Sequence, residues 1–145
     1  MIKKVSFLMA LLAVAAGSGS AYATSCTAST GYNELTGIQI RTLLNGSLVC
    51  SPATGPYSNQ EAHSGGNITD YKMGPTDPVD PSVSVGTYTV ANGTGAQITY
   101  SYTAGGGTYN YTVWGTTTSG SGSYDFCAGT SPVTVRVVAG SSGPC

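Results

Sequence analysis

Reactive side chains are concentrated in one stretch of this chain, residues 57–81. The stretch holds the single histidine, His63, together with most of the charged residues that follow residue 23: Glu61, Asp70, Lys72, Asp77 and Asp80. Glu61 and His63 are two positions apart, so a strand would place both side chains on one face. A carboxylate and an imidazole in contact can transfer protons, and three aspartates offer the oxygen ligands that calcium prefers.

Neither chemistry is supported by a recognisable motif. The aspartate spacing matches no EF-hand loop, and the chain has no Gly-x-Ser-x-Gly elbow for a nucleophile. Prolines at 78 and 81 favour an extended, turn-forming path. We therefore interpret residues 57–81 as a polar loop or lid across one end of the fold, without a catalytic residue, metal or cofactor. Glu61 and His63 are included among the candidate ligand-binding residues.

Tyrosines supply the second candidate site. Six of the ten tyrosines fall on the side of the predicted strands that also carries the apolar residues: Tyr88, Tyr100, Tyr102, Tyr109, Tyr111 and Tyr124. A buried tyrosine brings a hydroxyl that needs a hydrogen-bond partner, so a lining of rings and hydroxyls suits a sugar or a flat organic molecule. The alternative is a tyrosine-rich core whose hydroxyls point out at the ends. Trp114 lies on the opposite face, at a strand end or on the surface.

The elements that position these side chains are predicted to be strands. Between residues 97 and 138, apolar and polar side chains alternate with period two, as in a half-buried strand. We predict eight strands, at 35–41, 47–51, 67–72, 83–91, 96–103, 108–114, 122–127 and 132–138. No helix is predicted after the leader, because no segment shows helical periodicity.

The turns between these strands indicate their order in space. Asn45–Gly46, Asn92–Gly93 and the glycine runs at 65–66 and 105–107 are typical of hairpins, because glycine adopts the positive φ angles that tight turns need. Consecutive hairpins make an antiparallel meander. The fold predicted is an all-β, closed or nearly closed up-and-down barrel, with a two-sheet β-sandwich as the alternative.

Gly86-Thr87-Tyr88 at the start of a strand, followed by a meander and Arg136 in the last strand, resembles the lipocalin and avidin type of barrel. Those families begin with a glycine-x-tryptophan motif that packs near a late arginine, and here tyrosine takes the place of the tryptophan. The resemblance covers about the last 60 residues of the chain. It implies a small barrel architecture and does not by itself imply a ligand.

The first 23 residues indicate export. Lys3 and Lys4 precede an apolar stretch and a small-residue cleavage site at 21–23, the pattern of a bacterial-type signal peptide. We expect residues 24–145 to form one domain that is secreted or periplasmic. That part has three basic and six acidic residues, a net charge of −3. So few basic groups argue against nucleic-acid binding and membrane insertion.

Four cysteines, Cys26, Cys50, Cys127 and Cys145, predict two disulfides in an exported domain of this size. A zinc site is disfavoured because no close CxxC pair occurs. Three pairings are open. We favour Cys26–Cys50 with Cys127–Cys145, and consider Cys26–Cys145 with Cys50–Cys127 as the alternative if the first and last strands are neighbours.

These observations favour a non-enzymatic binding module for a small molecule or glycan, with the ligand in the tyrosine-lined interior. The alternative is a structural subunit of an extracellular filament or matrix that self-associates, because low charge and β-prone edges favour edge-to-edge addition. Residues 24–33 would then be a candidate donated strand, unless Cys26 ties them to their own domain.

Overall fold

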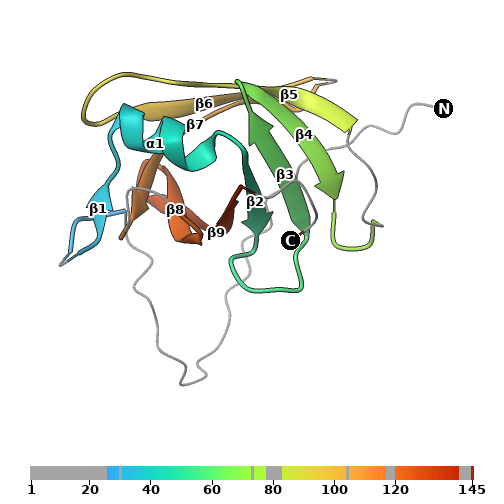
Figure 1. Cartoon of the computed structure of the whole chain (residues 1–145), viewed down its shortest axis with the longest axis horizontal. Helices are drawn as coiled ribbons and strands as arrows, with labels where there is room; N and C mark the ends of the chain where they lie inside the picture. Colours follow the sequence, from blue (N-terminus) through green and yellow to red (C-terminus); the bar gives the residue numbers. More distant parts are fainter. Residues whose placement is uncertain are drawn as a thin grey trace.

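A computed structural model describes residues 26–29, 31–72, 74–77, 83–103, 105–116, 120–140 and 145 (Figure 1). The predicted signal peptide and Asp80 lie outside the described residues. In chain order, the elements are β1 (Asn33–Glu34), α1 (Gly37–Leu44), β2 (Ser47–Ser51), β3 (Asn59–Ser64), β4 (Asn67–Lys72), β5 (Val83–Val90), β6 (Gln97–Tyr102), β7 (Gly107–Gly115), β8 (Gly122–Ala128) and β9 (Ser131–Ala139).

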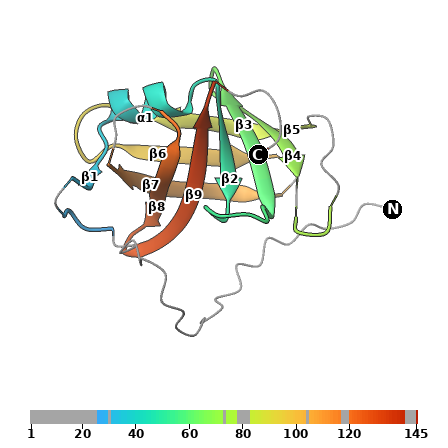
Figure 2. The same ribbon diagram turned by 60° about the horizontal axis from the view of Figure 1, so that its bottom comes forward.

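The eight strands β2–β9 form a closed antiparallel barrel. Each strand pairs with the next along the chain, and β9 returns to pair with β2, where Val137 lies opposite Val49. In Figure 2, β8, β9, β2 and β3 run across β5, β6 and β7, so the barrel has two walls with crossing strands. The short β1 adds to β7 from outside the ring. The predicted up-and-down barrel is therefore confirmed.

Seven of the eight predicted strands are present, with ends that differ by at most one residue from the prediction. The prediction at 35–41 is wrong, because residues 37–44 form α1. Thr36 begins the helix: its hydroxyl accepts from the Gln39 N–H, and the Gln39 side chain accepts from the Thr36 N–H at 2.8 Å. This reciprocal capping box outweighs the β-prone composition. Asn45 ends the helix, so Asn45–Gly46 is a helix-to-strand turn and not a hairpin.

The eighth strand of the barrel is β3, inside the segment predicted to be a polar loop. Its inward side chains include Glu61 and His63, so the strand has no apolar face to reveal it in the sequence. Gly65 and Gly66, with φ of +55° and +84°, make the two-residue turn to β4. This hairpin sets Glu61 opposite Asp70 and His63 opposite Ile68.

The disulfides are Cys26–Cys127 and Cys50–Cys145, with Cα atoms 5.9 and 6.3 Å apart. Both pairings weighed from the sequence are wrong. Cys26 is thus bonded to β8, and Cys145 is bonded to β2. The Cys145 N–H also donates to Gln60 Oε1 on β3 at 2.8 Å. Two disulfides are consistent with an oxidising extracellular or periplasmic environment.

The helix seals one end of the barrel. Ile40, Leu43 and Leu44 of α1 are buried, and they join an apolar cluster that includes Ile98, Val113 and Val137 from the barrel walls. Burying each such side chain contributes about 1.5–3 kcal/mol. The Gly37 N–H donates to the Gly93 carbonyl at 2.9 Å, which fixes the helix to the β5–β6 turn. The opposite end of the barrel is lined by polar and aromatic side chains that are partly exposed.

The closed eight-stranded antiparallel barrel is consistent with a lipocalin-like architecture, but the side chains behind the resemblance do not meet. Tyr88 is buried on the inner face of β5. Arg136 is exposed on β9, where it lies opposite Cys50 of the outer face. The packing of an early aromatic ring on a late arginine is therefore not present here.

Candidate functional site

The inner face of β5, β6 and β7 carries five of the tyrosines predicted to line the interior. Cross-strand register sets Tyr88 opposite Tyr100, and Tyr100 opposite Tyr109. Tyr102 and Tyr111 are the adjacent inward residues on β6 and β7. The alternation in the sequence therefore identified a set of side chains that the structure brings together.

Tyr100 is the centre of this cluster. Its ring centroid lies 5.4–6.3 Å from five other rings, those of His63, Tyr88, Tyr102, Tyr111 and Phe126. Edge-to-face and offset aromatic pairs at these distances stabilise one another. The middle of the barrel is thus filled by rings from five strands, β3, β5, β6, β7 and β8.

Glu61 lies beside the cluster and is held by Tyr102. The Tyr102 hydroxyl donates to the carboxylate, with distances of 2.9 and 3.0 Å to its two oxygens. Burial raises the pKa of Glu61 to about 7, the Tyr102 hydrogen bond opposes this rise, and the negative charge of Asp70 adds to it. Burial also raises the pKa of Asp70. Near neutral pH, Glu61 is thus close to its point of half-protonation.

His63 is fully buried and neutral. Burial lowers the pKa of its imidazole to about 4, although a hydrogen bond to the Glu61 main chain works against the fall. His63 Nδ1 is 3.3 Å from the Glu61 carbonyl oxygen, which can only accept, so Nδ1 carries the proton. The remaining nitrogen, Nε2, is then a bare acceptor. His63 therefore contacts the backbone of Glu61 and not its carboxylate, so the two side chains do not form the acid–base pair considered above.

Two buried polar atoms in this cluster have no hydrogen-bond partner among the described residues: Tyr100 Oη and His63 Nε2. Leaving a buried polar group unpaired costs about 1–3 kcal/mol. The two atoms belong to rings whose centroids are 5.4 Å apart and whose planes are nearly perpendicular. An unpaired donor and an unpaired acceptor therefore lie in neighbouring rings at the centre of the barrel.

The interior changes character along the barrel. Towards α1 it is apolar and closed. Away from α1 its side chains are polar or aromatic and partly exposed: Glu61, Asp70, Tyr102, Tyr109 and Tyr111. We call these five residues the polar end. Asp70 was not predicted to contact a ligand, although the Gly65–Gly66 turn in the sequence already implies that it faces Glu61.

Two aromatic residues lie away from this end. The Tyr124 hydroxyl donates to the Gly120 carbonyl at 3.1 Å, and its ring covers Gly115 so closely that a Cβ there would collide with it. Trp114 lies on the outer wall, as predicted, and stacks on Tyr32 with ring centroids 6.5 Å apart. The Tyr32 hydroxyl donates to Asp125, which anchors this N-terminal segment to β8.

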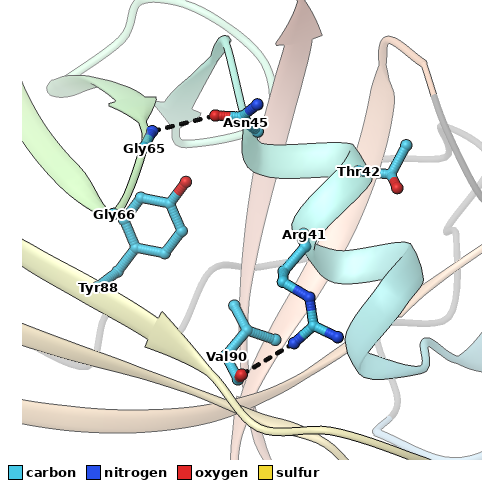
Figure 3. A pocket seen from close by; sticks show the side chains of 7 residues that line it. All are labelled: Arg41, Thr42, Asn45, Gly65, Gly66, Tyr88 and Val90. Carbon is cyan, nitrogen blue, oxygen red and sulfur yellow. Dashed lines mark hydrogen bonds between the residues drawn. The ribbon is translucent and has the colours of Figure 1, made fainter.

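A hollow of about 570 Å³ lies on the other side of Tyr88, between α1 and the β3–β4 hairpin (Figure 3). Its polar groups already bind one another. Arg41 donates to the Val90 carbonyl at 3.0 Å and to Asn92 Oδ1 at 3.0 Å, and Asn45 Oδ1 accepts from the Gly65 N–H at 3.0 Å. These bonds fasten α1 to the barrel, so the hollow has few free groups for a ligand.

Within the described ranges, no three His, Cys, Asp or Glu side chains gather as metal ligands. Nor does any described helix have the length and apolar character needed to cross a membrane. Comparison of the chain with protein-family models, with curated proteins and with solved structures finds no match. The site must therefore be interpreted from its own chemistry.

Proposed function

We propose that the protein is a secreted, non-enzymatic binding module for a small molecule or glycan, bound at the polar end of the tyrosine-lined barrel interior. One observation carries this proposal: the hydroxyl of Tyr100 and Nε2 of His63 are buried without hydrogen-bond partners among the described residues, in a cluster that also contains the partly exposed Tyr102, Tyr109 and Tyr111. A ligand that supplies hydrogen bonds to buried unpaired groups gains affinity, because the protein has already lost their hydration.

The arrangement suits binding better than catalysis. The Glu61 carboxylate is held by Tyr102, and His63 is turned to a main-chain carbonyl, so no acid and base are aligned on a common reacting atom. Tyrosine rings offer large contact area with little loss of side-chain entropy, which favours recognition.

The alternative role in a filament or matrix needs free strand edges. Each of β2–β9 pairs with a strand on both sides, and among the described strands only β1 has an unpaired side. Closure of a barrel removes the edges through which strands add. Cys26, which falls within the segment considered for donation, is bonded to Cys127 of β8, and this bond argues against donation.

Native mass spectrometry with size-exclusion chromatography, on protein produced by export, tests the proposal. We expect a monomer that carries an additional mass, and this mass should disappear on denaturation. Tyr100→Phe removes one hydroxyl from the interior, and Tyr32→Phe removes one from the outer wall. Only the first should release the additional mass. A ladder of oligomers without any additional mass would reject the proposal in favour of assembly.

A further inference from the structure

The polar end of the barrel holds two carboxylates side by side. Glu61 on β3 and Asp70 on β4 are direct cross-strand partners, and the charge of Asp70 acts on Glu61. Like charges that face each other on a sheet destabilise it, so this pair has a cost that the fold alone does not explain.

Among the described residues, no basic side chain forms an ion pair with either carboxylate. Of the three basic residues after the leader, Arg41 is bound to the Val90 carbonyl beside α1, and Arg136 is exposed on the outer wall. Lys72 lies opposite Gln60, and a register shift separates this pair from the pair formed by Glu61 and Asp70. The main-chain N–H of Lys72 donates to Asp70 Oδ1 at 3.1 Å.

Tyrosine rings surround the same position. Tyr102 and Tyr109 meet edge to face with centroids 6.0 Å apart, and Tyr100 and Tyr111 do the same at the same distance. Such crossed rings present faces in several directions, and the negative face of a tyrosine ring attracts a cation. The Tyr100 hydroxyl, buried and without a partner among the described residues, is close enough to Glu61 to be affected by its charge.

We propose that the polar end binds a small organic cation, a quaternary ammonium or a protonated amine, between the Glu61 and Asp70 carboxylates and the tyrosine rings. This inference rests on the proposed function and specifies its ligand class. The carboxylates supply the missing counter-charge, and the rings contact the alkyl groups. The Tyr100 hydroxyl is available to accept an N–H or to bind a polar substituent.

The proton equilibrium of Glu61 gives the binding a defined pH dependence. The titratable groups that face Glu61 are His63 from its own strand, Asp70 from β4, Tyr100 and Tyr102 from β6, and Tyr111 from β7. His63 stays neutral above about pH 5 because its pKa is lowered to about 4. The tyrosines stay protonated because burial raises their pKa values. Ionisation of Glu61 therefore dominates near neutral pH.

Calorimetric titration with choline and with its uncharged isostere, 3,3-dimethylbutan-1-ol, tests the inference. We expect choline to bind about tenfold more tightly at pH 8, since a cation–π contact and a nearby carboxylate together exceed 1.4 kcal/mol. Choline affinity should fall about tenfold from pH 8 to pH 6 as Glu61 takes up a proton, and that of the alcohol should not change. Glu61→Gln should remove the preference for choline over the alcohol. Glu34→Gln, on the outer β1, should leave this preference unchanged.

The possible results separate this inference from the function on which it rests. If the alcohol binds as tightly as choline or more tightly, the inference that the ligand is a cation is rejected, and the proposed function remains as a binding module for neutral ligands. A choline preference that survives Glu61→Gln or does not change with pH also overturns it, because the carboxylate would then have no part. If neither compound binds and native mass spectrometry shows no retained mass, both the inference and the proposed function are rejected.

Discussion

Replacing Glu61 by glutamine isolates the cost of keeping a carboxylate inside the barrel. Glutamine has the same shape and still accepts a hydrogen bond from Tyr102, but it cannot ionise. In the folded chain the pKa of Glu61 is raised from the usual 4.5 to about 7. The folded state therefore holds the proton more tightly than the unfolded state, and the stability that this provides is present below pH 4.5 and lost as the pH rises through 7.

The magnitude follows from that difference in pKa, which corresponds to about 3 kcal/mol between the two protonation states. Glu61→Gln should thus match the wild type at pH 4 and exceed its free energy of unfolding by about 3 kcal/mol at pH 8. His63 acts in the opposite direction. Its lowered pKa provides stability above pH 6.5 that is lost as the pH falls towards 4. The two effects offset each other in the wild type, so the His63 effect becomes visible only in the variant.

Urea unfolding at pH 4, 6 and 8, followed by circular dichroism with the disulfides intact, measures these differences. Glu34→Gln controls for the change in net charge, because Glu34 is on the outer β1, opposite Trp114. A stability gain in Glu61→Gln that is the same at all three values of pH would refute the reasoning. So would a loss of stability at pH 8, since it would mean that the ionised carboxylate contributes favourably to the fold.

Three further changes test other parts of the structure. Tyr100→Phe removes a buried hydroxyl that has no partner among the described residues, so the free energy of unfolding in urea should stay unchanged or rise by about 1 kcal/mol. Tyr102→Phe removes the hydrogen-bond donor to Glu61 and should lower the free energy of unfolding by about 1–2 kcal/mol at pH 8. Equal effects of the two substitutions would contradict the conclusion that only the Tyr102 hydroxyl is hydrogen-bonded. Gly37→Ala should lower the thermal midpoint although alanine favours helices, because its Cβ would collide with the Ala91 carbonyl oxygen, and a raised midpoint would exclude this close approach. Non-reducing peptide mapping should recover Cys26–Cys127 and Cys50–Cys145, and loss of either bond should cost about 4–5 kcal/mol, since each closes a loop of roughly 100 residues.

The sequence predicts the barrel wherever one face of a strand is apolar. From β6 to β9 the alternation is clear, and these strands and the inward tyrosines of the barrel are as predicted. The failures have physical causes. β3 is hidden because its inward residues, Glu61 and His63, are polar, and α1 is hidden because its start depends on the capping box of Thr36 and Gln39 and not on strong helix formers. The disulfide pairing depends on closure of the barrel, which brings distant strands together and leaves no trace in local spacing.

The interior side chains that destabilise the fold all lie in one half of the barrel. The end closed by α1 is apolar. The other half holds the carboxylate pair and, deeper in the barrel, a hydroxyl and an imidazole nitrogen that have no partner among the described residues. The free energy of unfolding of a domain of this size is about 5–15 kcal/mol. Side chains that together destabilise the fold by several kcal/mol therefore remove a large fraction of it, and a purely structural role does not explain them. A cation or hydrogen-bonding ligand would remove these costs on binding, because the carboxylates would gain a counter-charge and the hydroxyl a partner. The same residues that weaken the free barrel would thus provide the affinity for its ligand, and Glu61→Gln should raise stability while it lowers binding.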